Sequence, residues 1–290
     1  MNELLQIILN SVDKVLFYYN KNFKEVKKKF SEKSVHDLRV TIRRFLAVLN
    51  VLDKEISSGY IEILKKKLKK ELKLYNPLRD NQVQMIRIEK LTLTYQILIN
   101  FYNFLIAKEL EILEIIKAKL QNKSVEEINE AVFFSKIQLK QIVPKSEISK
   151  TVLIKRAFDE YQSVLERASL LDKNNLDSFH KLRLAFKNFR YTMEFLKPIL
   201  NLTDTYFKQL KGFQDVLGEI QDNRVLFESL NYWILNYDIA RQSEYFPVIE
   251  FLMNNRKNLF TKLNRRIKLL DRFWDNDYLE MNNLQASTKD

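Results

Sequence analysis

The chain has two histidines, His36 and His180, and each stands at the start of a short cationic segment. In "SVHDLRVTIRRF", residues 34 to 45, a helix turning by about 100° per residue puts His36, Arg39 and Arg43 on one face. A guanidinium group can give a phosphate two parallel hydrogen bonds, and an imidazole gains charge in mild acid. These residue types at this spacing therefore predict an anion-binding stripe.

The second histidine segment repeats the first. "SFHKLRLAFKNFRY", residues 178 to 191, aligns with it at an offset of 144, so that His180 matches His36 and Lys187 matches Arg43. An isolated run of Arg and Lys is more often a solvated helix face, but recurrence with both histidines in register favours a shared site. The stripe of the second segment consists of His180, Arg183, Lys187 and Arg190.

Two more segments repeat at an offset of 142. "LRDNQV" at 78–83 lies over "IQDNRV" at 220–225, and "KKLK" at 66–69 lies over "KQLK" at 208–211. Asp80 thus corresponds to Asp222, and Asn81 to Asn223. These matches predict a duplicated helical unit.

Composition predicts an all-α fold. The 290 residues include only three glycines and four prolines, and 46% are hydrophobic. Apolar residues recur at intervals of three and four, as in Leu38, Ile42, Phe45 and Leu49, and no segment alternates like a strand. Breaks are predicted near residues 31–34, 57–59, 76–77, 121–124, 143–149, 172–177 and 201–204, which gives about eight helices, and the repeat predicts four of them on each side of Pro144.

The repeat predicts how the helices are organised. Residues 1–145 and 146–290 each form a four-helix bundle, and the two bundles are related by a pseudo-two-fold axis within one domain. Phe45, Phe186 and Phe189 are expected in the core, beside the cationic stripes. Helix starts are expected at Ser34 and at Asp177 or Ser178, so that first-turn N–H groups point toward an approaching anion.

The net charge of +12 favours a polyanionic partner: nucleic acid, an anionic lipid surface or a phosphate polymer. With no cysteine, disulfides and thiolate chemistry are excluded, and a cytoplasmic location is expected. The uncharged run at 91–107 contains Gln96, Asn100 and Asn103, so a buried helix is expected there rather than a membrane span.

Metal binding and catalysis are not predicted. The cations around each histidine would repel a divalent ion, and no cluster of ligands accompanies them. There is no glycine-rich phosphate loop, no pair of carboxylates at the histidines and no catalytic triad order. We expect Asp80 and Asp222 to orient or neutralise arginines rather than to act as general bases. No enzymatic activity and no cofactor are expected.

The segments "VHDLRVTIRR", "FHKLRLAFKNFRY", "LRDNQV" and "LKGFQDVLGEIQDNRV" together resemble the CHAD family, the conserved histidine α-helical domain, over nearly the full chain. The resemblance implies two four-helix bundles around a basic channel or surface that binds inorganic polyphosphate, in a binding module that can associate with polyphosphate granules. By motif position, the implied ligand-facing set is His36, Arg39, Arg43, Arg44, His180, Arg183, Lys187 and Arg190, with Lys66, Lys69, Lys208 and Lys211 from the third helix of each unit.

Two positions depart from the repeat, since Asn188 stands opposite Arg44 and Gln221 stands opposite Arg79. Some family members carry a fused triphosphate-processing domain, but here two helical units account for the whole length, which implies a standalone module.

Two alternatives remain open at the level of sequence. The charge and the many aromatic residues also suit a nucleic-acid-binding helical protein. The basic runs "KKKLKK" at 65–70 and "KLNRRIK" at 262–268 also suit a scaffold on anionic membranes or protein partners.

Overall fold

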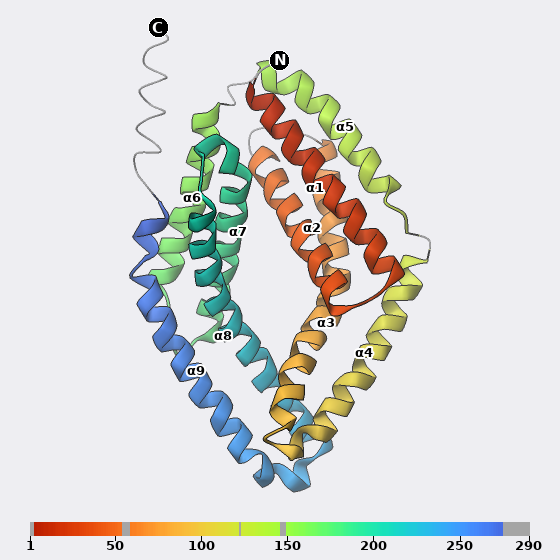
Figure 1. Cartoon of the computed structure of the whole chain (residues 1–290), viewed down its shortest axis with the longest axis vertical. Coiled ribbons are helices and arrows are strands. Elements are labelled where there is room, and N and C mark those ends of the chain that lie inside the picture. The colour runs from red at the N-terminus through yellow and green to blue at the C-terminus, as the bar shows by residue number, and fades with distance from the viewer. Residues whose placement is uncertain (1–2, 54–58, 122, 146–148, 275–290) are drawn as a thin grey trace.

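A computed structural model describes residues 3–53, 59–121, 123–145 and 149–274. The all-α prediction is confirmed, because these residues form nine α-helices and four short 3-10 helices without a strand (Figure 1). The elements are α1 (Glu3–Lys28), α2 (Glu32–Asp53), α3 (Gly59–Thr92), η1 (Gln96–Leu98), α4 (Ile99–Leu120), α5 (Glu126–Ile142), η2 (Val143–Lys145), α6 (Lys150–Ser169), α7 (Leu176–Leu200), α8 (Asp204–Tyr237), η3 (Ile239–Tyr245), α9 (Phe246–Ile267) and η4 (Leu270–Phe273).

The prediction of four helices on each side of Pro144 was wrong for the first half. In the described part of the chain, α1 to α5 precede Pro144 and α6 to α9 follow it. The break predicted at Asn76-Pro77 does not occur, since Pro77 lies inside α3. Tyr75 and Leu78 beside it are fully buried, and this packing offsets the roughly 3 kcal/mol that an internal proline costs.

Two real breaks were missed. The run at 91–107 is not one buried helix, because α3 ends at Thr92 and a turn with Leu93 87% exposed precedes η1 and α4. The β-branched Thr92 and Thr94 beside this turn are weak helix formers. The other break separates α8 from α9, where Pro247 at the first turn of α9 is a start signal that the sequence did carry. No helix among the described residues is long and apolar enough to cross a membrane.

Corresponding helices pack in the same order in both halves. In the first, α2 packs on α1 and α3, and α3 on α4. In the second, α7 packs on α6 and α8, and α8 on α9. Across the halves, α2 contacts α7 and α3 contacts α8 (Figure 1). Helix α5, which packs on α3 and α1, has no counterpart after α9 in the described residues. The division at 145/146 and the pseudo-two-fold axis stay predictions, and residues 146–148 lie outside the described part.

Two hydrophobic cores hold the halves together. The larger one contains Phe45, Phe186 and Phe189, each fully buried, which confirms their predicted place. The smaller one joins Ile88, Phe101 and other residues of the first half to residues such as Trp233 of the second, at the end where the α3–α4 and α8–α9 turns lie (Figure 1). Because α3 and α8 each contribute to both cores, their middle segments span the space between them.

Candidate functional site

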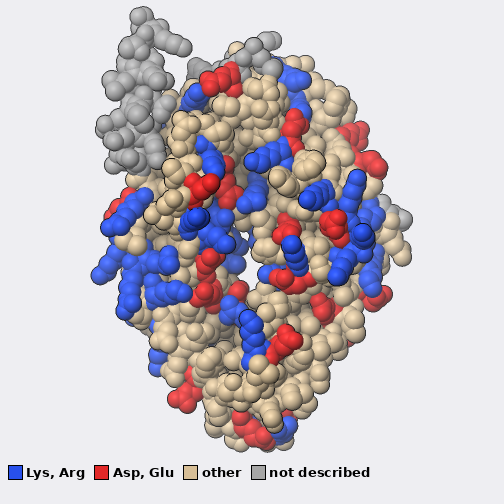
Figure 2. All heavy atoms as spheres, viewed as in Figure 1, with Lys and Arg blue, Asp and Glu red and all other residues tan. Residues whose placement is uncertain are grey.

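A cavity of about 540 Å³ lies between the two halves. Its walls come from α2, α3, α6, α7 and α8, and the α8 residues that line it, Gln221, Asp222 and Val225, lie between the residues that this helix gives to the two cores. In a space-filling view, Lys and Arg side chains gather around the hollow between the halves, with carboxylates among them (Figure 2). Six of the twelve predicted ligand residues line this cavity: Arg39, Arg43, Lys69, His180, Arg183 and Lys187.

The histidine helices α2 and α7 thus bring their cations to one place. Arg39 is 6% exposed and donates a hydrogen bond to the side-chain oxygen of Asn76 on α3, which fixes its guanidinium. Within the described residues, Arg43, Arg183 and Lys187 make no hydrogen bond or ion pair, and Nε of Arg183 is buried. Lys187 is buried and the two arginines are half-buried, and withdrawing a cation from water without a partner is costly, so this wall favours an anionic guest.

The cations lower one another's pKa. Burial, followed by the charges of Arg183, Arg43 and Arg39, lowers the pKa of Lys187 from 10.5 to about 6. Burial and Arg43 likewise lower the pKa of Arg39 to about 10. Three guanidinium groups, two from α2 and one from α7, thus act on the charge of one amine, which shows that the cations of the two helices lie close enough to interact.

Acidic residues offset part of the positive charge of the cavity. Asp80, Asp222 and Glu160 also line the cavity. Burial raises the pKa of Asp222, although Arg87 on α3 forms an ion pair with it at 3.1 Å across the two halves. The expectation that Asp222 neutralises an arginine is therefore confirmed.

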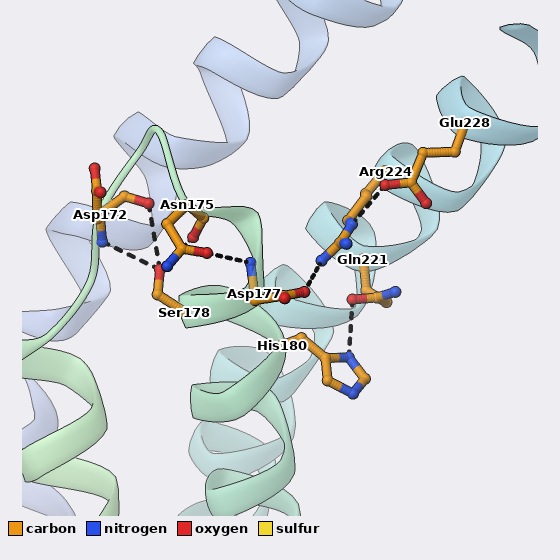
Figure 3. A network of polar contacts seen from close by, with 8 residues as sticks. All are labelled: Asp172, Asn175, Asp177, Ser178, His180, Gln221, Arg224 and Glu228. Carbon is orange, nitrogen blue, oxygen red and sulfur yellow. Dashed lines mark hydrogen bonds and ion pairs between the residues drawn. The ribbon is translucent and has the colours of Figure 1, made fainter.

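Polar contacts gather at the start of α7, where His180 contacts Gln221 (Figure 3). Its Nδ1 lies 3.1 Å from the side-chain oxygen of Gln221 on α8. Nearby, Arg224 donates to Asp177 at 2.7 Å, and this hydrogen bond lowers the pKa of the Asp177 carboxyl. The helix is capped by Asn175, which accepts from the N–H of Asp177, so the cap predicted at Asp177 or Ser178 was misplaced. Asn175 is favoured because its side chain reaches the N–H two residues on.

His36 does not line the cavity, unlike its repeat partner His180. The pKa of His36 is lowered, mainly because its imidazole is partly buried and secondly because the positive charge of Arg79 acts on it. Arg79 stands where the second half has Gln221, and it forms an ion pair with Glu32. The predicted cap at Ser34 was also wrong: α2 begins at Glu32, and Ser31 accepts from the N–H of Ser34 at 3.2 Å. His36 thus lies beyond the first turn of α2.

Five other predicted ligand residues lie outside the cavity. Arg44 and Arg190 share the carboxylate of Glu194, with Nε of Arg44 at 2.7 Å and Nη2 of Arg190 at 2.9 Å. Arg44 also lines a separate groove of about 290 Å³ between α1 and α2. Lys66, Lys208 and Lys211 are exposed, and Lys66 pairs with Glu62 on its own helix.

The sequence pattern does not predict several of the cavity residues. Arg156 and Glu160 come from α6, which carries no histidine motif, so only the packing of α6 on α7 reveals them. Asn76 lies where the sequence predicts a break, and Gln221 stands where the repeat departs from Arg79, so neither position carries a signal for the cavity. No group of three potential metal ligands occurs among the described residues.

Comparisons with known proteins agree with this fold. A family model described as "CHAD domain" matches residues 13–231. The crystal structure of the CHAD domain from the plant Ricinus communis is similar to this chain, with a TM-score of 0.65 and 18% identity. The similarity covers 96% of this chain and 91% of the plant domain. PptA from Streptomyces chartreusis is also similar, with a TM-score of 0.61 and 11% identity. That similarity covers 92% of this chain and 99% of the PptA chain. No curated protein matches the chain.

Proposed function

The chain belongs to the CHAD domain family, and from that premise we propose that it binds inorganic polyphosphate in the cavity between its halves. One observation carries the proposal. Arg43, Arg183 and Lys187 line a single cavity from two helices, and within the described residues none of them has an anionic partner. Polyphosphate is a flexible polyanion, so it can contact both guanidinium groups at once and stabilise the protonated form of the Lys187 amine.

Binding in this proposal combines two effects. Phosphate oxygens accept hydrogen bonds from the guanidinium groups of Arg39, Arg43 and Arg183, and the chain releases its condensed counterions as it enters. Asn76 holds Arg39 in place for this contact, and Arg87 neutralises the Asp222 carboxylate that would otherwise repel a phosphate.

A nucleic acid would need more than this cavity offers. Single strands are held by aromatic side chains on which bases stack. Among the described residues that line the cavity, Tyr191 is the one Phe, Tyr or Trp residue, and it is 6% exposed. We therefore favour a ligand that is all phosphate, and we expect polyphosphate to displace RNA or DNA whatever its base sequence.

We also propose that the protein is a binding module rather than an enzyme, that it uses no metal or cofactor, and that it acts in the cytoplasm. An association with polyphosphate granules follows if the cavity holds a long chain. The positions of Arg44, Arg190, Lys66, Lys208 and Lys211 outside the cavity suggest that they act on such a chain only where it leaves the cavity.

The test is titration with polyphosphate of defined length at several salt concentrations. The wild type is compared with R43Q/R183Q, and with K257Q/R265Q, which removes two exposed charges of α9 that do not line the cavity. Each phosphate contact on a single-stranded polyanion contributes about 0.7 to the slope of log affinity against log salt. We expect R43Q/R183Q to lose at least tenfold in affinity and roughly one unit or more of slope.

The control variant should keep both values close to those of the wild type. Circular dichroism and thermal unfolding confirm that all three proteins fold. Equal losses in the two variants would mean that the net charge, rather than the cavity, attracts the polymer, and the proposal would then be wrong.

A further inference from the structure

Lys187 is a buried primary amine on the wall of the cavity. Its side chain is 7% exposed, and it has no hydrogen-bond acceptor or ion-pair partner among the described residues. It lies on α7 one helical turn after Arg183 and one turn before Tyr191, so the cavity is the space that its amine faces.

The groups around this amine are mostly cationic. Acidic counterparts are few, and Asp222, the acidic residue with a resolved effect on the pKa of Lys187, is already paired with Arg87 at 3.1 Å. By element, the charged or titratable lining residues are Arg39 and Arg43 from α2, Lys69 and Asp80 from α3, Arg156 and Glu160 from α6, His180 and Arg183 from α7, and Asp222 from α8.

A protonated amine in this place would be both desolvated and repelled. Burial, Arg183, Arg43 and Arg39 together lower the pKa of Lys187 to about 6. The amine is thus mostly neutral at pH 7, whereas an ordinary lysine of pKa about 10.4 is neutral in fewer than about one molecule per thousand. Desolvation or a neighbouring cation activates a lysine as a nucleophile in this way.

We propose that Lys187 is a covalent acceptor for small phosphorylated aldehydes, whose phosphate binds the guanidinium groups of Arg43 and Arg183. Nζ of Lys187 bonds to the carbonyl carbon, and the carbonyl oxygen leaves as water with the two amine hydrogens. The product is an imine, formed without oxidant or reductant. Because the phosphate uses the guanidinium groups that also serve polyphosphate, the inference rests on the anion site of the proposed function.

The cavity suits such a guest in size and chemistry. At about 540 Å³ it is within the range of small-molecule sites. Leu184, Tyr191 and Val225 give it an apolar wall beside the cations, against which the carbon skeleton of the aldehyde can pack. Lys69 lines the same cavity but is exposed, so its amine is not desolvated in the same way.

The experiment uses equimolar pyridoxal 5′-phosphate at pH 7, followed by borohydride reduction and peptide mass spectrometry. We expect imine absorbance, and reduced adduct on the peptide that contains Lys187. K187M should lose most of the signal. K181M, which removes an exposed lysine of the same helix, should keep it. Pyridoxal without the phosphate should react at Lys187 at least tenfold more slowly. The inference would be overturned if the adduct were spread evenly over exposed lysines, or if a folded K187M variant formed as much adduct as the wild type.

Two further readouts separate this inference from the proposed function. The reaction rate at Lys187 should level off above about pH 7, while that of an ordinary lysine rises about tenfold per pH unit up to its own pKa. Polyphosphate should protect Lys187 if both proposals hold. If the adduct forms and polyphosphate neither binds nor protects, the proposed function fails and the inference stands. If polyphosphate binds and Lys187 stays unmodified, the inference alone fails.

Discussion

Asn81 and Asn223 make the same contact in the two halves of the chain. The amide of Asn81 donates to the backbone carbonyl of Leu105 in α4 at 2.8 Å, and that of Asn223 donates to the carbonyl of Leu252 in α9 at 3.1 Å. Both side chains are buried, at 2% and 0% exposed. The repeat seen in the sequence therefore extends to a buried hydrogen bond that joins the third helix of each half to the helix after it.

The two asparagines differ in one respect, which gives the first prediction. The side-chain oxygen of Asn223 accepts from Nε of Arg256 at 3.1 Å, while that of Asn81 has no partner among the described residues. We expect N223A to leave the Arg256 guanidinium unsatisfied and to lower the free energy of unfolding by about 1–3 kcal/mol. N81A should cost less. Urea unfolding measures both, and a larger loss for N81A would contradict the assignment.

Adjacent residues on α2 provide a matched test of the cavity. Arg43 lines it without a partner in the described part of the chain, whereas Arg44 points to Glu194 on α7. R43Q and R44Q remove the same charge one residue apart. We expect R43Q to weaken polyphosphate binding about tenfold or more, because a lost hydrogen bond to a charged group costs about 1.5–3 kcal/mol. R44Q should change affinity less than about threefold, because Arg44 does not line the cavity and its charge is already paired with Glu194.

Isothermal titration with polyphosphate at one salt concentration measures both affinities. An R44Q loss equal to that of R43Q would place the ligand across both faces of α2, and would support the wider set of residues that the family resemblance implies.

A third prediction concerns pH. A bound polyanion stabilises protonated Lys187, so its pKa rises from about 6 in the free protein to a higher value in the complex. Between those two values binding takes up a proton, and the affinity falls by up to about tenfold for each unit of rising pH. Titrations in buffers of different ionisation enthalpy measure the proton uptake directly.

K187M should flatten this pH profile, while H36N should leave it unchanged, because His36 does not line the cavity. H180Q serves as the second control. If H180Q rather than K187M flattens the profile, the histidine expectation from the sequence is right and the proposed role of Lys187 is wrong.

The sequence pattern predicted the helical fold and the convergence of cations from the two histidine helices, but it did not predict the partner of each side chain. The low glycine and proline content predicted the all-α fold, and the register of the repeat predicted that Arg39, Arg43, Arg183 and Lys187 belong together. The partner of Arg44 lies 150 residues away, and no local pattern encodes such a contact.

The repeat also hides differences between the halves. Lys69 lines the cavity, while its repeat partner Lys211 does not. A shared position in a repeat fixes where a residue lies along its helix. It does not fix which neighbour that helix faces, because the packing of the two halves need not be equal. Pro77 shows a related limit, since its helix continues where local propensity predicts a break.

The last prediction is that the cationic cavity makes the free protein less stable. In the unfolded chain Lys187 has an ordinary pKa near 10.4, while in the native state the pKa is about 6. Between these values the unfolded state binds the proton that the native state lacks, so Lys187 opposes folding, and its opposition weakens as pH rises. K187M replaces the amine by an apolar side chain of similar volume.

We expect K187M to raise the free energy of unfolding by on the order of 1–3 kcal/mol at pH 7, and by less at pH 9. K181M, at an exposed position of the same helix, should stay within about 0.5 kcal/mol of the wild type at both values. Urea unfolding at the two pH values provides the measurement. A destabilised K187M, or a difference that grows with pH, would mean that Lys187 is satisfied in the free protein. The predicted gain instead marks Lys187 as a residue whose benefit appears only when an anion is bound.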